Sequence, residues 1–275
     1  MKLLTQIICT LAICISFSAQ AWTQRTPAPV AQCAIHVPYG TPQVAKPDAT
    51  FICRQGYFTL HDNQAKIPVW GAWSITPDHV NGCIPRSNGF ATDASLMPGK
   101  RSTPQDYAGN GYDQGHNAND AHQSWDQQVE YESFLMSNMM PQLPGLNRGI
   151  WKLLETATGS WVFSRQTTII IYSGPIYATT DPGIGTNKVV VPRGFFKIVI
   201  DTKSSETLAF IFPHKENQGN DLTVVQSTVA QVEKLTGITF AIPQGHNKAV
   251  KEPIWPIDFK SVAANKKQLC KGAAE

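Results

Sequence analysis

Short runs of apolar and aromatic residues in the first third of the chain predict β-strands. Such runs cover residues 50–61 and 67–75, and the polar segment Asp62-Asn63-Gln64 separates them. Because aromatic and β-branched residues suit a pleated, half-buried surface, the two runs predict a hairpin. The preceding residues, 22–48, contain repeated prolines, which remove backbone donors. We expect an irregular arm there.

The second half of the chain mixes helical and strand patterns. Apolar residues recur at helical spacing from Leu146 to Ala157, and Gly159 is a plausible stop for that helix. A second helix is predicted over residues 221–235, with Gly237 as its C-terminal cap. Runs rich in Val, Ile and Phe predict strands over residues 161–164, 167–173, 188–201, 207–212 and 238–242.

Two long segments show little periodicity. Residues 76–112 predict a long loop, which in a compact domain is often functional. Residues 245–275 predict an irregular tail that Cys270 could fix in place. Strands outnumber helices and seldom alternate with them, so the pattern predicts an α+β fold with a largely antiparallel sheet, in one domain over residues 22–275.

The N-terminus has the pattern of a cleavable signal peptide. Lys2 precedes an apolar run, and Ala19-Gln20-Ala21 has the small-x-small form that a signal peptidase reads. We expect cleavage after Ala21, a secreted or periplasmic protein, and no membrane attachment afterwards. A lipoprotein acylated at Cys14 is less favoured, because the large Ile13 precedes that cysteine.

Cysteine usage fits an exported chain. Four cysteines lie beyond the signal, and an even number in such a chain suggests two disulfides, for which three pairings exist. We favour Cys33–Cys53 with Cys83–Cys270. No C-x-x-C pair is present, which argues against a zinc site built on cysteine.

The charge of the chain gives little guidance. The formal net charge of the 275 residues is +3, too small to indicate a polyanionic partner by itself. A positive field would need a local patch, for which the candidates are Arg86, Lys100, Arg101, Arg148, Lys152 and Arg193.

Three polar motifs in the middle of the chain are more informative. They are Tyr-Asp-Gln-Gly-His at 112–116, Ser-Asn-Met-Met-Pro-Gln at 137–142 and Leu-Asn-Arg-Gly-Ile-Trp-Lys-Leu-Leu-Glu at 146–155. D-x-G-H alone recurs by chance, but the three motifs in this order and spacing are specific. Together they resemble the DNA/RNA non-specific endonuclease family, which carries a ββα-metal (His-Me finger) motif. The resemblance covers about residues 86–235.

This resemblance implies an exported endonuclease that hydrolyses phosphodiester bonds in both DNA and RNA and leaves 5′-phosphates. It implies Mg²⁺, or Mn²⁺ in its place, as the metal. His116 would be the general base, a role that neutral histidine suits because its ordinary pKa is about 6.5. Gly115 would let the backbone pass close to the substrate or to the helix.

The resemblance makes Asn147 the metal ligand, since Mg²⁺ prefers oxygen ligands and keeps several waters. A helix N-cap is the other role open to this asparagine. Glu155 follows eight residues later, which in a regular helix is an offset of about 80° and about 12 Å. We therefore expect Glu155 to reach the metal through bound water, with an exposed helix glutamate as the alternative.

The resemblance assigns Arg86 to the scissile phosphate, because a planar guanidinium suits phosphate. Asp113 could orient the site or pair with a cation. Asn138 and Gln142 would support His116 or the metal waters, or else serve as structural amides. Gln114 replaces the family's usual arginine, and Arg148 could compensate as a substrate-binding residue.

Two other functions remain open. Loss of the motif arginine is compatible with a weak or inactive nucleic-acid-binding protein on a nuclease scaffold. A zinc hydrolase using His116 and His122 is disfavoured, because no H-E-x-x-H pair or third ligand accompanies them.

Overall fold

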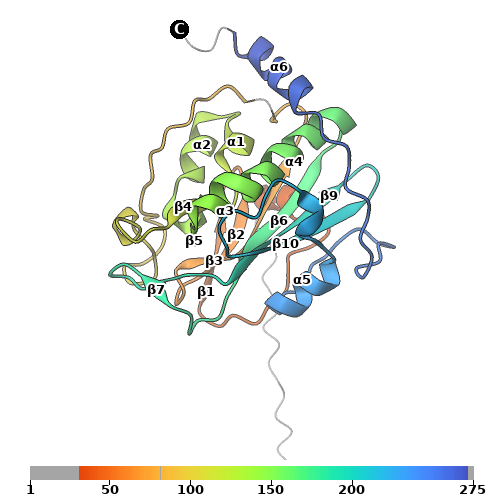
Figure 1. The fold of residues 1–275 in the computed structure, drawn as a ribbon. Helices are drawn as coiled ribbons and strands as arrows, with labels where there is room; N and C mark the ends of the chain where they lie inside the picture. The colour runs from red at the N-terminus through yellow and green to blue at the C-terminus, as the bar shows by residue number, and fades with distance from the viewer. Residues whose placement is uncertain (1–30, 81, 272–275) are drawn as a thin grey trace, which may run out of the picture.

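A seven-stranded antiparallel sheet forms the centre of the computed structural model, which describes residues 31–80 and 82–271 (Figure 1). The α+β class and the antiparallel sheet predicted from the sequence are confirmed. In spatial order, the strands are β1 (Ala49–Cys53), β2 (Phe58–Asp62), β3 (Ile67–Ile75), β6 (Ile169–Ile176), β9 (Gly194–Asp201), β10 (Thr207–Pro213) and β11 (Gln226–Ser227).

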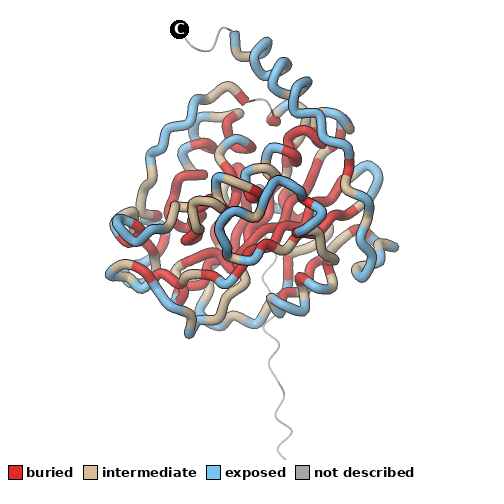
Figure 2. The backbone as a smooth tube through the Cα atoms, viewed as in Figure 1, coloured by how far each residue is buried: buried red, intermediate tan, exposed pale blue. Residues whose placement is uncertain are grey.

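Helices cover both faces of this sheet, and two separate apolar clusters result. Helix α4 (Lys152–Arg165) packs on one face through Trp151, Leu154 and Trp161. Helix α5 (Val229–Thr236) contributes Val229 and Val232 to the cluster on the other face. Because both faces are covered, the residues of β9 are all buried, and Figure 2 shows the buried chain running through the middle of the molecule.

A short ladder beside the sheet carries the motifs found in the sequence. Strand β4 (Asp113–His116) pairs antiparallel with β5 (Met139–Gln142), and the chain then continues into α4. This is the ββα arrangement that the resemblance implied. The remaining elements are α1 (Asp120–Gln123), α2 (Gln127–Ser133), α3 (Pro144–Leu146), α6 (Phe259–Leu269), the ladder of β7 (Gly183–Ile184) with β8 (Val189–Val190), the 3₁₀-helices Ala31–His36, Pro104–Asp106, Met136–Asn138 and Leu222–Val224, and the π-helical turn Asn147–Trp151.

Helix α4 runs further than predicted. It passes through Gly159 and includes residues 161–164, which the sequence pattern had assigned to a strand. Trp161 lies seven residues after Leu154 and therefore continues the same buried stripe. Gly159 is buried against Val80, so it serves close packing, and the helix instead ends at Gln166 in the left-handed conformation.

The second predicted helix is broken in the middle. Residues 221–235 form a 3₁₀-turn, the short strand β11 and then α5, which begins at the cap Thr228. The break has a packing reason: Val225 belongs to the cluster beneath α4, whereas Val229 belongs to the cluster on the opposite face. Gly237 caps α5 as predicted, with φ of 69°.

Other boundaries also differ from the predictions. Residues 50–61 make two strands, β1 and β2, and residues 188–201 are interrupted before β9. Residues 238–242 contribute a single bridge, Gln43 with Thr239. The tail predicted to be irregular contains the helix α6, in which no residue is buried.

Both disulfides form in the favoured pairing, Cys33–Cys53 and Cys83–Cys270. The second joins residues separated by 187 positions and holds the tail, as expected for Cys270. The predicted signal peptide lies outside the described residues. Within residues 31–80 and 82–271, the helices are all too short or too polar to cross a membrane.

Candidate active site

A cleft of about 890 Å³ opens between β4, α4, α6 and the long loop before β4. Seven of the residues singled out in the sequence line this one cleft, although they come from separate parts of the chain. They are Arg86, Asp113, Gln114, His116, Asn147, Arg148 and Glu155.

His116 ends strand β4 and lies between two aromatic rings. Its ring centroid is 4.8 Å from that of Phe134 and 5.7 Å from that of Phe90. Burial among these rings lowers the pKa of His116 to about 4, with the nearby Arg86 acting in the same direction and Asp120 opposing it. The imidazole is therefore neutral and able to accept a proton at neutral pH.

The two ring nitrogens of His116 have different surroundings. Nε2 is enclosed and has no hydrogen-bond partner among the described residues. The ring nevertheless lines the cleft, so Nδ1 is the nitrogen that a water in the cleft can reach.

Two residues of the second motif support the ladder instead of lining the cleft. Asn138 holds the backbone after His116: its amide donates to the carbonyls of Ala118 and Ser133, and its oxygen accepts from the Ala118 N–H. Gln142 is buried over Gly115, where a Cβ would lie 2.0 Å from its Oε1. Gly115 thus makes room for a neighbouring side chain. Asn138 takes the structural alternative, whereas the amide of Gln142 has no hydrogen-bond partner among the described residues.

Asn147 is oriented by its neighbours. Its Nδ2 donates to Asp113 at 3.0 Å, and Arg148 grips the same carboxylate with two hydrogen bonds of 2.6 and 2.9 Å. Because the amide nitrogen is engaged, the amide oxygen is the end left for a cation or a water. The carboxylate of Asp113 therefore fixes the orientation of the Asn147 amide. Metal-binding side chains are commonly oriented in this way by a hydrogen bond to a second residue.

The chain between Asn147 and Glu155 is not a regular helix. Residues Asn147–Trp151 form a π-helical turn in which Gly149 has non-helical angles, φ −98° and ψ −117°. The separation calculated for a regular helix therefore does not apply here. Such turns occur often at functional sites, where they redirect a side chain.

Arg86 reaches the cleft from the long loop. It forms an ion pair with Asp120 of α1, and its guanidinium lies 4.8 Å from the centroid of the Phe134 ring. Since His116 contacts the same ring, Phe134 positions both groups. Of the other predicted patch residues, Lys152 lines the cleft, whereas Lys100, Arg101 and Arg193 do not.

Glu155 is paired with a buried lysine from the central sheet. Lys197 of β9, only 2% exposed, places its Nζ 3.1 Å from Glu155 Oε1 and 3.9 Å from the centroid of the Trp151 ring. Burial raises the pKa of the Glu155 carboxyl, and the Lys197 ammonium opposes that shift. The expected alternative of an exposed helix glutamate is therefore wrong.

His122 fixes the backbone of the same helix. Its Nδ1 accepts from Trp73 Nε1 at 3.3 Å, so its Nε2–H donates to the Glu155 carbonyl at 3.0 Å. Both ring nitrogens are used, so this histidine is not available to a zinc ion beside His116.

Sequence reasoning missed three residues of the cleft or its support: Asp120, Phe134 and Lys197. One signal was available for Lys197, since a lone lysine interrupts the apolar run of β9. Asp120 and Phe134 carry no such signal, because an aspartate beginning a helix and a phenylalanine are ordinary in any chain.

The donor set at the cleft fits a hydrated hard cation. No group of three or more His, Cys, Asp or Glu side chains that could hold a metal occurs within the described residues. An ion here would rely on the oriented Asn147 oxygen and on water, with Glu155 close enough to the cleft to bind such water. Mg²⁺, which keeps several of its waters, fits this arrangement.

Comparison with known proteins places this site in a family. The family model described as DNA/RNA non-specific endonuclease matches residues 38–245. A nuclease from Nostoc sp. is 31% identical over 212 residues, covering 73% of this chain and 76% of that protein. Human mitochondrial endonuclease G is 28% identical over 217 residues, covering 74% and 71%.

A solved structure gives the same result for the fold. The crystal structure of an EndoG/EndoGI complex superposes with a TM-score of 0.70 at 25% identity, covering 82% of this chain and 97% of that one. The matched region contains the ββα ladder, the oriented asparagine and the buried histidine described above. On these grounds, the chain belongs to the DNA/RNA non-specific endonuclease family and is a nuclease.

Proposed function

We propose that this nuclease is an exported, Mg²⁺-dependent enzyme that hydrolyses DNA and RNA with His116 as its general base. The observation that carries the proposal is the meeting, in one cleft, of a neutral histidine, an oriented amide oxygen and two arginines. Each supplies one requirement of phosphodiester hydrolysis.

His116 Nδ1 accepts the proton of a water as the water oxygen attacks phosphorus. The bond from phosphorus to the 3′ oxygen breaks, which leaves the phosphate on the 5′ side of the next nucleotide. Bound Mg²⁺ would offset the charge that develops on the phosphoryl and departing oxygens. Asn147 would hold that ion, and Glu155, kept in place by Lys197, would hold one of its waters.

The arginines bind the phosphate without reading sequence. Arg86 carries its charge into the cleft from the loop. Arg148, paired with Asp113 next to Gln114 in the sequence, supplies the cation that the glutamine lacks. Contacts to phosphate and sugar carry no sequence information, which accounts physically for a non-specific enzyme.

The test compares wild type with His116→Ala on plasmid DNA and on RNA, with Mg²⁺ and with EDTA. Wild type should degrade both, EDTA should stop cleavage, and Mn²⁺ should restore it. His116→Ala should be slower by about 10²–10⁴-fold, as for a lost general base. The matched control His246→Ala, whose histidine does not line the cleft, should retain activity. Binding without cleavage under all metals would favour the inactive scaffold.

Export is supported by the leader-like residues 1–21 and by the two disulfides, which persist in oxidising compartments. Some relatives carry mitochondrial names, so the location needs its own test. Full-length chain expressed in a Gram-negative host should appear in the periplasm or medium with Trp22 as its first residue. Cytoplasmic protein that begins at Met1 would contradict this.

A further inference from the structure

Helix α6 forms one wall of the cleft, although it lies beyond residues 38–245, the stretch that the family model matches. Four of its residues line the cleft together with His116 and Asn147: Phe259, Val262, Ala263 and Lys266. Their spacing of three, four and seven residues places them on one face of the helix. Helix α6 therefore presents a defined side to the site.

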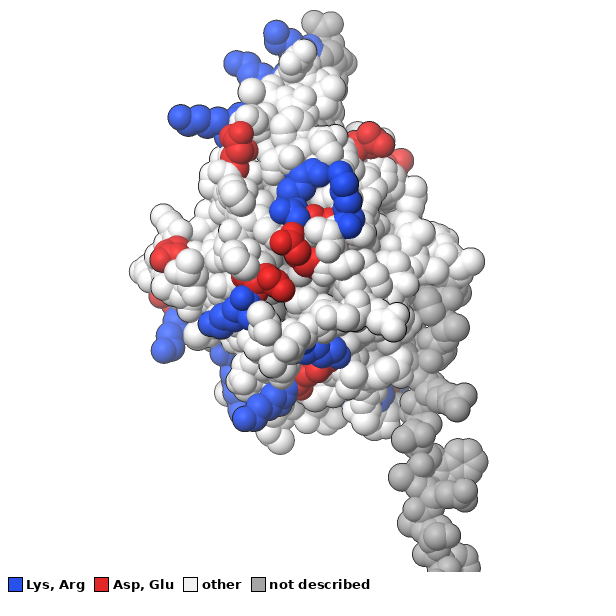
Figure 3. All heavy atoms as spheres, turned by 90° about the vertical axis from the view of Figure 1, so that its right-hand side faces the viewer, with Lys and Arg blue, Asp and Glu red and all other residues white. Residues whose placement is uncertain are grey.

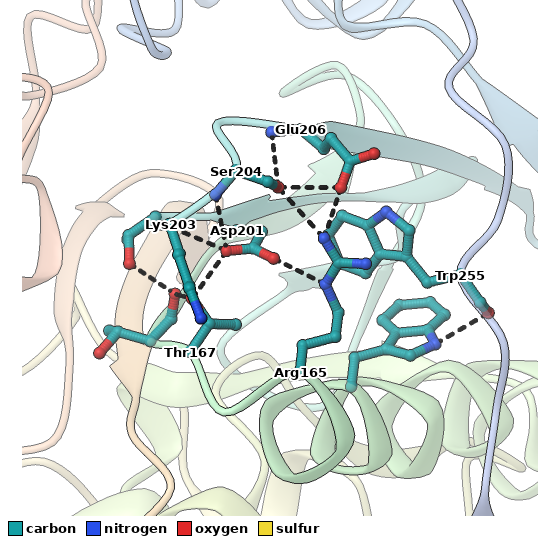
Figure 4. A network of polar contacts seen from close by, with 10 residues as sticks. Arg165, Thr167, Asp201, Lys203, Ser204, Glu206 and Trp255 are labelled. Carbon is teal, nitrogen blue, oxygen red and sulfur yellow. Dashed lines mark hydrogen bonds and ion pairs between the residues drawn. The ribbon is translucent and has the colours of Figure 1, made fainter.

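Both ends of α6 are fixed to the rest of the molecule. Before its first turn, the Asp258 N–H donates to Ser160 Oγ of α4 at 2.8 Å. Trp161 Nε1 donates to the Trp255 carbonyl at 3.0 Å, and Arg165 lies over the Trp255 ring (Figure 4). After its last turn, Cys270 is joined to Cys83, three residues before Arg86. The helix is thus held over the cleft instead of trailing from it.

The charged side chains of α6 are all basic. The helix contains Lys260, Lys266 and Lys267 and no acidic residue. Figure 3 shows basic side chains projecting from this end of the molecule, at the top of the view, whereas acidic and basic groups alternate below. Within the described residues, Lys266 and Lys267 form no ion pair, and neither does Lys152 of α4 in the same cleft. These charges are available to an outside anion.

We propose that α6 is a second phosphate-binding element, which holds the backbone of the DNA or RNA strand beyond the scissile phosphate. The inference rests on the proposed function. Charge complementarity selects the occupant, because Lys266 on the cleft face, with Lys260 and Lys267 on the same helix, matches a chain of phosphates that leaves the cleft. Binding of this kind is independent of sequence and weakens as salt rises.

A length-dependent assay tests the helix. Lys266→Gln/Lys267→Gln and wild type are compared on a 40-nucleotide duplex and on a tetranucleotide, which fills little more than the scissile site. The loss in kcat/KM on the duplex should be about tenfold near 0.1 M salt, and at least about five times the loss on the tetranucleotide. In a plot of log kcat/KM against log salt concentration, the slope should become less negative by about 1–2, since each lost phosphate contact changes the slope by about 0.9.

Matched variants separate charge from position. Lys203→Gln/Lys234→Gln removes the same charge from exposed positions that do not line the cleft, and it should behave as wild type. Cys83→Ser/Cys270→Ser keeps all the lysines but frees the end of α6, and it should show the same preferential loss on the duplex.

Three outcomes are distinguishable. Preferential loss on the duplex, with the flatter salt dependence, supports the inference. An unchanged rate and salt slope on the duplex, or equal losses on both substrates, would overturn it. If wild type cleaves neither substrate, the proposed function itself fails, and binding of the uncleaved duplex by the same variants then decides the role of α6.

Discussion

The side-chain amide of Asn147 donates to Asp113 Oδ2 over 3.0 Å, and Arg148 donates to both oxygens of the same carboxylate. One acidic side chain thus sets the direction of the amide oxygen and restrains a neighbouring cation. Asp113 reaches this position from β4, three residues before His116, so the base and the oriented amide share one strand as their support.

The carboxylate of Asp113 should be needed for tight metal binding. Asp113→Ala frees the amide of Asn147 to rotate, so we expect about a 10–100-fold loss of activity, the usual effect of removing a group behind a metal ligand. Titration of the cleavage rate with Mg²⁺ should show half-saturation at a higher concentration.

The control for Asp113 is Arg148→Gln, which removes the ion pair but leaves the hydrogen bond to Asn147. This variant should keep the Mg²⁺ response of wild type and bind nucleic acid more weakly. A normal Mg²⁺ titration for Asp113→Ala would show that the carboxylate does not orient the amide.

The buried pair of Lys197 and Glu155 leads to a prediction about stability. Lys197→Met leaves the Glu155 carboxylate buried without its partner, so the free energy of unfolding should fall by about 3–5 kcal/mol. Urea unfolding measures this change. Lys197→Met/Glu155→Gln removes both charges and should recover much of the lost stability while cleavage stays low. If the double variant is no more stable than the single one, the ion pair is not the cause.

Gln114 offers a gain of function. It lines the cleft next to the Asp113–Arg148 pair, and Gln114→Arg would restore a cation where the family usually has one. A charge-assisted contact to phosphate should raise kcat/KM on long DNA by about two- to tenfold at moderate salt. Gln114→Lys supplies the charge without a planar guanidinium, so its kcat/KM should increase less than that of Gln114→Arg. No gain from either would mean that Arg148 already fills this role.

A pH-dependent loss of stability is predicted at His36, far in sequence from the cleft. The Ser74 N–H donates to its Nδ1 at 3.2 Å, which favours the neutral ring, whereas the Gln55 carbonyl, 3.1 Å from Nε2, acts in the opposite direction and raises the pKa. Burial lowers the pKa of His36 to about 4. The unfolded chain, with an ordinary pKa near 6.5, then binds the proton first as the pH falls.

The stabilising effect at His36 is therefore complete above pH 6.5 and is lost between pH 6.5 and about 4. When the pH falls from 7.5 to 5.5, the unfolding free energy of wild type should decrease by about 1 kcal/mol more than that of His36→Gln. Urea unfolding at both values measures the difference. Equal losses in the two proteins would assign the acid sensitivity to other groups.

Local patterns predicted the strands of the central sheet and the Gly237 cap, because these follow from residue types that admit few alternatives. The pattern failed where one run of residues serves two surfaces: residues 221–235 look like one amphipathic helix, yet Val225 and Val229 pack on opposite faces of the sheet. Sequence spacing does not show which face a residue will meet.

The site was predictable where its residues lie in motifs. His116, Asn147 and Glu155 were identified this way, and the cleft brings them together. Lys197, Phe134 and helix α6 come from distant parts of the chain and meet the motifs only through the tertiary fold. Asn138 shows the converse, since a motif residue can bind the backbone instead of lining the cleft.

Helix α6 follows the other residues of the cleft in the chain, and this order has a consequence for biosynthesis. Residues 113–155, which carry the base and the oriented amide, leave the ribosome well before residues 259–270, and the Cys83–Cys270 bond closes only after both. A nascent chain that ends before α6 therefore lacks the outer wall and its lysines, and a reduced chain keeps the lysines on a helix whose last turn is no longer held by the disulfide. If α6 holds the substrate strand, the nuclease reaches its full rate on long nucleic acid only after residues 259–270 have been made and an oxidant has closed the Cys83–Cys270 bond.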